Sequence, residues 1–474
     1  MAYQHGINVS EESTNFTDVT SNSIAQVVIG TAPVNRLDHP EAAVNVPVLC
    51  ESISDCQNKL GYSTDFKTYT LCQSMYTSFL LMGVAPVVFI NVLDPQKHKK
   101  SVSDKELAVN NKTASIPEEV IVSSLVIKVD GTEVEQEKYV AAWNEDKLMV
   151  HFTEELTGTV SAAYDVIDPT KVTAEDIIGA VDLETGKRTG AELIKDVFPS
   201  LGVVPFLLLA PGWTTDDTVG AVLANKTKGI NGCYNAVAIL DLDTSVATTR
   251  AKAIEEKKKR TTNEMCLVEY PMVEAAGQAM SLSALKAALI MYQAVSTGGV
   301  TCSSPSNQRV AIQRCVLANG DEVYFDQEDG NELNAEGICT VISRNGFYTW
   351  GNNTAAYPDT MDPKDRWIMA RLVFNYIENM FINTYFSTVD GALTNKMVED
   401  ILTDENIILS SYTEKGYIAG GKISYNAGEN PESEILNGHF RFHTAIAANV
   451  PGEYIHNVLS FDVDALETAI LGGE

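Results

Sequence analysis

The chain has 474 residues and a formal net charge of −29, from 34 lysines and arginines against 63 aspartates and glutamates. Apolar residues make up 45% and charged residues 20% of the sequence, which argues against wholesale disorder and allows a substantial core. A surface this acidic repels phosphate, so nucleic acid and anionic membranes are poor candidate partners and a basic protein surface is a better one. At roughly 150 residues per domain, the length predicts about three domains.

The sequence predicts neither a membrane span nor a secretion signal. Its most apolar stretch, 80–93, is shorter than the roughly 20 residues of a spanning helix and contains Pro86 and Asn91. The first residues lack a basic segment followed by an apolar one, so we expect synthesis in the cytoplasm. No C-x-x-C pair occurs, and most cysteines lie in apolar runs. Free buried thiols are therefore favoured over disulfides, zinc or redox chemistry for Cys50, Cys56, Cys72, Cys233, Cys266, Cys302, Cys315 and Cys339.

Residues 1–22 are polar but carry scattered apolar side chains, which a solvated tail would not need. The pattern has no helical period and predicts an extended N-terminal arm with β potential. At roughly 3.3 Å per residue, fifteen such residues span about 50 Å, against a radius of gyration of about 23 Å for a compact chain of this length. The arm can therefore reach beyond its own subunit. Its apolar members are Tyr3, Ile7, Val9, Phe16 and Val19.

Residues 23–98 and 171–350 together have the texture of one α/β domain. Apolar runs at 24–33, 85–93, 203–212 and 233–240 read as strands buried on both faces, as in a parallel sheet. Amphipathic segments between them predict helices. The predicted helices span 68–82, 215–226 and 281–295.

Residues 99–170 differ in texture from what surrounds them. Short strand-like runs follow one another closely, and Asp130-Gly131 between two of them is typical of a hairpin turn. This spacing predicts a small antiparallel β-sandwich. Since α/β texture resumes after residue 170, the sandwich is predicted to be inserted into the core domain.

The last part of the chain combines helices and strands. Residues 351–453 are predicted to form an α+β domain, and 454–474 a C-terminal arm. The predicted helices are 363–386 and 394–413, and the predicted strands are 417–426, 439–449 and a terminal strand at 454–463.

Catalytic and metal-binding motifs appear only as fragments. Ser283 and Lys286 match S-x-x-K without its companion motifs, and a helical surface is the better interpretation. The acidic segment 326–332 fails the calcium-loop template, which favours a solvated turn. His439 and His443 would lie about 13 Å apart on one strand, too far to share a metal ion. The sequence therefore gives no sign of an enzyme, a cofactor or a metal site.

A longer segment, 333–354, resembles the signature of contractile tail sheath proteins of myophages, phage-tail-like bacteriocins and related injection machines. In that family an L-N-x-x-G-[IV] run leads through a strand and an R-x-G-[FY] turn into W-G-x-[RN]-T. The matching residues here are Leu333, Asn334, Gly337, Ile338, Arg344, Gly346, Phe347, Trp350, Gly351 and Thr354. The glycines punctuate a short β run, and the two aromatic residues offer large area for burial at a domain junction.

Weaker matches in the same order extend the resemblance over nearly all of the chain except 99–170. They are G-T-A-P-V at 30–34, N-x-P-V-L at 45–49, V-P-x-x-L-L-A-P-G at 204–212, S-P-S-N at 304–307 and the opening Y-Q-H-G at 3–6. One departure concerns the residue after W-G, often arginine in the family. Asn352 and Asn353 stand here instead, which puts an arginine contact at that point in doubt.

The resemblance implies a fold and a mechanical function. The fold would be a three-layer core of subtilisin-like topology with an inserted β-sandwich, a C-terminal α+β domain and extended terminal arms. No protease activity is carried over, because no Asp, His and Ser stand in a subtilisin arrangement. Subunits would stack as a helical polymer around an inner tail tube protein, with baseplate and tail terminator proteins as further partners. Contraction would drive the tube through the target cell envelope, and no cofactor would be required.

The terminal arms would join the subunits by adding strands to neighbouring sheets. The C-terminal residues assigned to this role are Tyr454, Ile455, Val458, Leu459, Phe461 and Val463. The protein would be made in the host bacterial cytoplasm and assembled in a virion tail or tailocin. The basic runs 97–100 and 257–260 are expected to sit apart from the acidic faces and to pair with them across the lattice. The alternatives are a cytoplasmic α/β enzyme with an accessory β domain and a baseplate or receptor-binding component.

Overall fold

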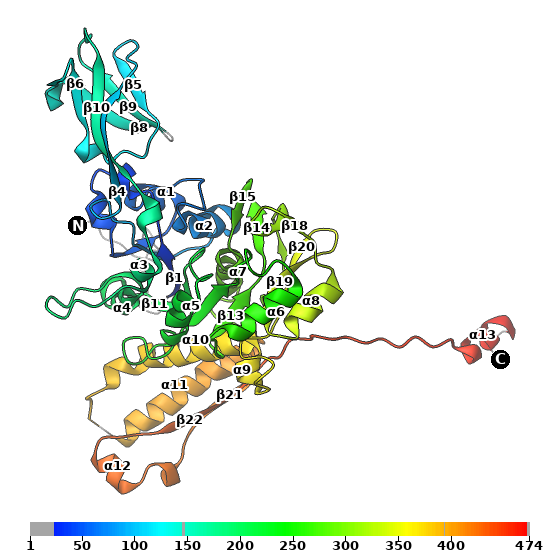
Figure 1. The fold of residues 1–474 in the computed structure, drawn as a ribbon. Helices are drawn as coiled ribbons and strands as arrows, with labels where there is room; N and C mark the ends of the chain where they lie inside the picture. Colours follow the sequence, from blue (N-terminus) through cyan, green and yellow to red (C-terminus); the bar gives the residue numbers. More distant parts are fainter. Residues whose placement is uncertain (1–22, 145–146, 393, 472–474) are drawn as a thin grey trace, which may run out of the picture.

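The computed structural model of the chain describes residues 23–144, 147–392 and 394–471 (Figure 1). The predicted N-terminal arm, with Tyr3, Ile7, Val9, Phe16 and Val19, lies outside the described residues. Within the described part, no helix is both long and apolar enough to cross a membrane.

Nine strands form a central sheet in the order β16-β20-β19-β13-β12-β11-β1-β3-β2. The pairs from β3 across to β19 are parallel, and the pairs β2–β3, β19–β20 and β16–β20 are antiparallel. The protein is thus a mixed α/β structure, as the apolar runs predict. The strands are β1 (Ile24–Gly30), β2 (Pro47–Cys50), β3 (Val87–Asn91), β11 (Val204–Leu209), β12 (Val237–Asp241), β13 (Cys266–Glu269), β16 (Arg309–Val310), β19 (Ile338–Ser343) and β20 (Phe347–Trp350).

Every residue of β1, β3, β11 and β12 is buried, because helices cover the sheet. One group of helices consists of α2 (Leu71–Met75), the π-helical turn η3 (Tyr76–Met82) and α7 (Leu282–Ser296), which contact one another. A second group contains α3 (Ala174–Ile178), α4 (Ile194–Leu201) and α5 (Asp217–Asn225). The remaining helices of the core are α1 (Ile53–Lys59), α6 (Arg250–Lys259) and α8 (Gln327–Asn334).

A small separate sheet lies beside the central one, in the order β15-β14-β17-β18. Its strands are β14 (Met272–Ala275), β15 (Gln278–Met280), β17 (Arg314–Val316) and β18 (Glu322–Val323). The sequence did not predict this sheet, because its strands have two to four residues and leave little periodicity to detect.

The segment that follows β3 forms two small antiparallel sheets with a hydrophobic core of their own. Lys99 pairs with Ile167, so the chain leaves and re-enters the core domain at adjacent points, and the β-structure projects from one end (Figure 1). Asp130-Gly131 forms the predicted hairpin turn between β6 and β7. The strands are β4 (Lys99–Glu106), β6 (Val126–Val129), β7 (Thr132–Glu133) and β10 (Val160–Ile167) in one sheet, and β5 (Thr113–Ile116), β8 (Tyr139–Asn144) and β9 (Lys147–Phe152) in the other.

Two long helices and a two-stranded sheet form the opposite end of the molecule (Figure 1). The predicted helix 363–386 is interrupted at Trp367, whose extended backbone separates α9 (Pro363–Arg366) from α10 (Ile368–Tyr385). The other elements are α11 (Asn395–Glu414), β21 (Ile418–Tyr425), α12 (Glu432–Leu436), β22 (Phe442–Ala448) and α13 (Val463–Leu471). The predicted terminal strand at 454–463 is corrected at Val463, which begins a helix. Residues 454–462 pair with no strand of the described chain, and their pairing with a neighbouring sheet stays a prediction.

Candidate functional site

The two-stranded sheet β21–β22 is the first component of the candidate site. Its strands pair antiparallel from Tyr425–Phe442 to Ile418–Ala448. One face packs on α11, where Ile423 and Leu409 are buried, whereas alternate residues of β22 are exposed. A sheet of two strands leaves two edges whose backbone groups can accept another strand.

Asn406 of α11 occupies the edge of β21 at one point. Its Nδ2 donates to the Ile423 carbonyl oxygen at 3.2 Å, and its Oδ1 accepts from the Ile423 N–H at 3.1 Å. Both backbone polar groups of Ile423 are therefore engaged.

Beside β22, Asn430 does the same for Arg441, the residue before the strand: its Nδ2 donates to the Arg441 carbonyl at 2.9 Å and its Oδ1 accepts from the Arg441 N–H at 2.7 Å. Within the strand, the Ser424 hydroxyl donates to the His443 carbonyl at 3.2 Å, but Ser424 lies on the paired strand β21, so this bond does not engage the outer edge. Side chains therefore interrupt the β21 edge inside its strand and the β22 edge only before its strand, at Arg441.

The segment 449–462 extends from the end of β22 and is the second component. It has no secondary structure and runs away from the body of the molecule (Figure 1). Large apolar side chains on it and at the first residue of α13 are strongly exposed, which for a folded protein indicates a surface that a partner covers. The exposed fractions are 81% for Tyr454, 88% for Ile455, 76% for Val458, 88% for Leu459, 76% for Phe461 and 63% for Val463.

Arg366 holds the root of this extended segment. Its guanidinium lies over the rings of Trp367 at 4.0 Å and Tyr357 at 4.5 Å, where cation–π attraction stabilises it. One nitrogen lies 3.2 Å from Glu453 Oε2, and Nε donates to Asn353 Oδ1 at 3.0 Å. The segment therefore leaves the body in a direction set by a largely buried arginine.

Next to this root lies the segment 333–354, which the sequence singled out. Leu333 is buried at the end of α8, and the Trp350 indole N–H donates to Asn331 Oδ1 at 3.0 Å. The side-chain amide of Asn334 is oriented so that both its nitrogen and its oxygen have partners. In this orientation its nitrogen donates to the carbonyl oxygens of Ile338 at 2.8 Å and Trp350 at 3.1 Å. Thr354 is buried and donates to the Asp365 carbonyl at 2.5 Å. These contacts connect β19 and β20 to the helices that carry the C-terminal sheet.

Two glycines of this segment let the backbone of other parts of the chain approach closely. Gly337 has φ +70°, and a Cβ there would lie 2.6 Å from the Tyr357 carbonyl oxygen. Gly351 has φ +136°, and a Cβ would lie 3.0 Å from Cys339 Cα. Each position combines a left-handed backbone with no room for a side chain, so other residues would displace the junction.

A buried polar cluster lies at the carboxyl ends of β12 and β13. Lys286 Nζ is 3.6 Å from Glu269 Oε1, and neither side chain is exposed to solvent. Burial raises the pKa of Glu269 to about 8, against the opposing attraction of Lys286. Ser283 donates its hydroxyl to Asp241 at 2.5 Å, and burial also raises the pKa of Asp241.

This cluster corrects the interpretation of the S-x-x-K match as helical surface. Ser283 and Lys286 are both buried, because α7 is apolar around most of its circumference and lies between other elements. The cluster offers a nucleophile no path to a substrate, and its contacts are those of a structural ion pair. Within the described residues, no group of three or more His, Cys, Asp or Glu side chains could hold a metal ion.

Two further predictions are corrected. Residues 326–332 do not form a solvated turn but the start of α8, where Asp326 caps the helix and Asp329 completes a capping box. The basic runs do not sit apart from acidic groups: Lys97 pairs with Asp176, Lys99 with Asp165 and Lys258 with Glu336.

The comparison with proteins of known family decides how these features are understood. No family model matches the chain. The tail sheath protein of Burkholderia phage BcepMu is 28% identical over 464 residues, which cover 92% of each chain. This chain is a homologue of phage tail sheath proteins.

Solved structures share the fold of this chain. A chain in the cryo-EM structure of the anti-feeding prophage baseplate matches over 98% of this chain and 100% of its own length, with a TM-score of 0.57 and 16% identity. A chain of an extracellular contractile injection system, the PVC sheath complex in its contracted state, matches over 97% of this chain and 100% of its own length, with a TM-score of 0.55 and 16% identity. At this identity the likeness concerns the fold alone.

In this chain, the residues of segment 333–354 that match the sheath signature fall into two groups. Leu333, Asn334, Gly337, Ile338, Trp350, Gly351 and Thr354 meet at the junction described above. Arg344 is exposed in the turn between β19 and β20, where a Cβ on Gly346 would meet the Arg309 guanidinium at 3.3 Å, and Phe347 is half-buried on β20.

The sequence of this chain did not single out Arg366 or Asn406 as functional residues. Asn352 and Asn353 raised doubt about an arginine contact after W-G, yet Arg366 brings a guanidinium to Asn353 from a neighbouring helix. The D-R-W sequence in front of a long helix was the available signal for Arg366. Asn406 gave no signal, because its strand partner is 17 residues away and polar helix residues are usually exposed.

Proposed function

We propose that this chain is the repeating subunit of a contractile tail sheath, a structural protein rather than an enzyme. Its subunits would polymerise around an inner tube and contract to drive that tube through the target cell envelope. The observation that carries the proposal is the C-terminal segment 449–471, whose apolar side chains are exposed beside an open strand edge in a homologue of a tail sheath protein.

The proposal includes the finer architecture that the resemblance implies. The core at 23–98 and 171–350 would be a three-layer, subtilisin-like arrangement, with an inserted β-sandwich at 99–170, a C-terminal domain at 351–453 and arms at 1–22 and 454–474. The arms would add strands to neighbouring C-terminal sheets, preferentially along Phe442–Ala448 at the β22 edge, since Asn406 interrupts β21 within the strand whereas Asn430 engages Arg441 before β22 begins. The extended lattice would be a metastable state whose repacking performs the mechanical work.

The proposed partners are other copies of the chain, the tube protein, and baseplate and terminator proteins, in a particle assembled after synthesis in the bacterial cytoplasm. The excess of acid supports the proposal that nucleic acid is not a partner. A baseplate role is the second candidate, because one matched fold comes from a structure of a contractile baseplate.

Negative-stain microscopy of the purified chain distinguishes the two candidates. A sheath subunit forms long tubes at high protein concentration, whereas a baseplate component forms closed rings or small assemblies. Deleting 454–474 is expected to leave a folded, non-polymerising subunit, and deleting 100–166 should leave tubes intact if the β-sandwich is peripheral. A strictly monomeric wild-type chain at high concentration would overturn the proposal.

A further inference from the structure

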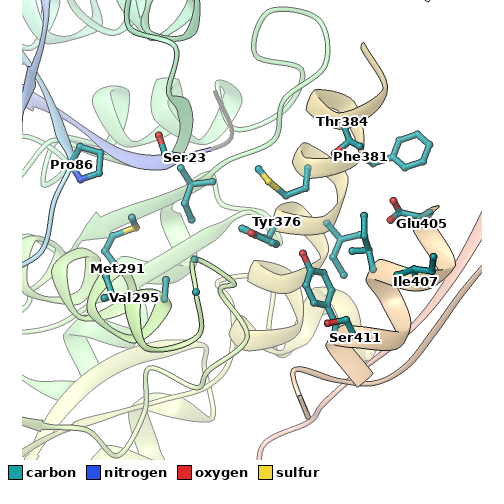
Figure 2. A pocket seen from close by; sticks show the side chains of 18 of the residues that line it. Ser23, Pro86, Met291, Val295, Tyr376, Phe381, Thr384, Glu405, Ile407 and Ser411 are labelled. Atoms are coloured by element: carbon teal, nitrogen blue, oxygen red, sulfur yellow. The ribbon is translucent and has the colours of Figure 1, made fainter. Parts of the chain in front are cut away.

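An apolar groove lies between the core and the C-terminal helices (Figure 2). It has a cavity volume of about 720 Å³ and is lined by α7, α10, α11 and the Ala85–Pro86 peptide. Val295 and Ile407 on its walls are 64% and 62% exposed. Nothing in the described chain covers it. The apolar side chains that form most of its surface are Met291, Val295, Met380, Phe381, Ile407 and Ile408.

The polar groups around the groove restrict what it can bind. No lysine or arginine lines it among the described residues, so it offers nothing to a phosphate or an acidic segment. Its one carboxyl, Glu405, is mostly buried and lies 3.4 Å from the Tyr385 hydroxyl. The groove is therefore suited to the uncharged, apolar face of a peptide segment.

The same chain carries an apolar helical face without a partner. In α13, Val463, Leu466 and Ile470 follow one another at helical spacing and are 63%, 46% and 71% exposed. Thr468 lies on the opposite side of the helix. Isolated helices shorter than about 12 residues are marginal in water, and α13 has 9 residues. Its stability therefore has to come from packing against another surface.

The position of α13 indicates that this surface belongs to another copy of the chain. The extended segment before it, 449–462, runs away from the body after Arg366 holds Glu453, which leaves residues 454–462 between this anchor and α13 (Figure 1). At roughly 3.3 Å per residue, this stretch reaches about 30 Å. A contact in which each copy donates its helix and receives another is heterologous and propagates along a polymer.

We propose that α13 of one copy docks with Val463, Leu466 and Ile470 in the groove between α7, α10 and α11 of a second copy. The contact rests on the proposed function, because it requires copies to lie side by side. It differs from strand addition at β22: the helix at the end of the segment would engage a second, separate surface of a neighbour. Each subunit would then be held by its neighbour at two points along one arm.

Variants of the full chain that each add one cysteine test the contact directly, in a Cys233→Ser background because Cys233 is half-exposed whereas the other seven native cysteines are buried. One preparation carries Ile470→Cys and the other Ile407→Cys, and the two are mixed under mild oxidation. We expect a disulfide-linked species of twice the chain mass in the mixture, and far less of it with Thr468→Cys in place of Ile470→Cys. Absence of a mixed dimer, or a cross-link formed only within a chain that carries both cysteines, would overturn docking between copies.

A second measurement separates this inference from the proposed function. Leu466→Asp places a charge on the apolar face, and Thr468→Asp places the same charge on the opposite face as a matched control. If the groove takes the helix, the concentration needed for polymerisation rises about tenfold or more for Leu466→Asp and stays nearly unchanged for Thr468→Asp. Tubes of equal stability from both variants would refute the docking while leaving the sheath function intact. A wild-type chain that forms no tubes would refute the function, and the mixed cross-link would still decide the docking.

Discussion

Lys286 and Glu269 form an ion pair at 3.6 Å in which neither side chain is exposed to solvent. Such a pair is costly to break where the carboxyl is ionised, because the remaining charge has no water to solvate it, and a Glu269 pKa of about 8 places that condition at about pH 9. At that pH we expect Lys286→Met to lower the free energy of unfolding by about 3 kcal/mol. The double variant Lys286→Met with Glu269→Leu should recover most of the loss, since it leaves no buried charge. Urea unfolding of non-assembled chains measures both, and equal losses in the two variants would contradict the pairing.

The same carboxyl predicts a dependence of stability on pH. Burial raises the pKa of Glu269 to about 8, so the folded state holds a proton that the unfolded state releases at much lower pH. Stability from this group is full below the unfolded pKa and is lost as the pH rises toward 8. The slope is at most about 1.4 kcal/mol per pH unit for one proton. Glu269→Gln should be flatter than the wild type in urea unfolding between pH 5 and 8. Parallel curves would contradict the expectation.

Buried strands could be predicted because long apolar runs without polar interruptions are typical of strands covered on both faces. The burial of Lys286 was also predictable in principle, since it is the one charged residue in the apolar helix segment 282–291. Ser283 and Lys286 were interpreted from the S-x-x-K match, whereas the apolar residues around them in the sequence indicate burial. The short strands β14, β15, β17 and β18 were not predictable, because two to four residues show no period.

The C-terminal segment marks a different limit of sequence reasoning. Its apolar side chains predict that it is covered by something, and their exposure in the single chain is consistent with that. Whether residues 454–462 become a strand depends on a partner edge that lies outside the chain. The helix α13 was missed because its nine residues make only about two and a half helical turns, too few to show a clear period.

Gly337 tests the role of close backbone approach in the segment that resembles the sheath signature. Gly337→Ala combines an unfavourable φ of +70° with a Cβ 2.6 Å from the Tyr357 carbonyl oxygen. Gly320 has φ +87° but open space around it, so Gly320→Ala isolates the backbone cost. We expect Gly320→Ala to lower the free energy of unfolding by about 1 kcal/mol. Gly337→Ala should lower it by about 2 kcal/mol more than Gly320→Ala does. Thermal unfolding of both variants measures the difference, and equal losses would show that the junction yields easily.

Asn406 provides a test of which sheet edge is open. Asn406→Ala removes both side-chain hydrogen bonds to Ile423 and should destabilise the C-terminal helices and sheet by about 1 to 3 kcal/mol. Thr403→Ala, at an exposed position on the same helix, should change stability by less than about 0.5 kcal/mol. Hydrogen exchange of the Ile423 amide reports the loss locally. An amide as protected in Asn406→Ala as in the wild type would mean that the edge is covered by something else.

Arg366 offers a way to loosen the C-terminal segment without unfolding the body. Arg366→Gln removes the guanidinium from Trp367, Tyr357 and Glu453 together. Glu453→Gln removes the ion pair alone, which for a half-exposed partner contributes about 0 to 1 kcal/mol. We expect Arg366→Gln to weaken polymerisation strongly and Glu453→Gln to weaken it little, with both chains folded by circular dichroism. Equal effects of the two variants would assign the role to the ion pair rather than to the stacked guanidinium.

The distribution of charge predicts how salt acts on assembly. The lysines of the two basic runs pair largely within the subunit, as Lys99 does with Asp165 at 2.8 Å and Lys258 with Glu336 at 3.1 Å. They are therefore poorly placed to offset a net charge of −29 across contacts between copies. Raising the ionic strength from about 0.05 M to about 0.5 M shortens the Debye length and screens this repulsion, so polymerisation should become stronger. Light scattering at matched protein concentration measures the effect, with sucrose of equal osmolality as the control. Dissolution of the polymers by salt would instead show that ion pairs between copies hold the lattice, and that the acidic excess is balanced across its contacts.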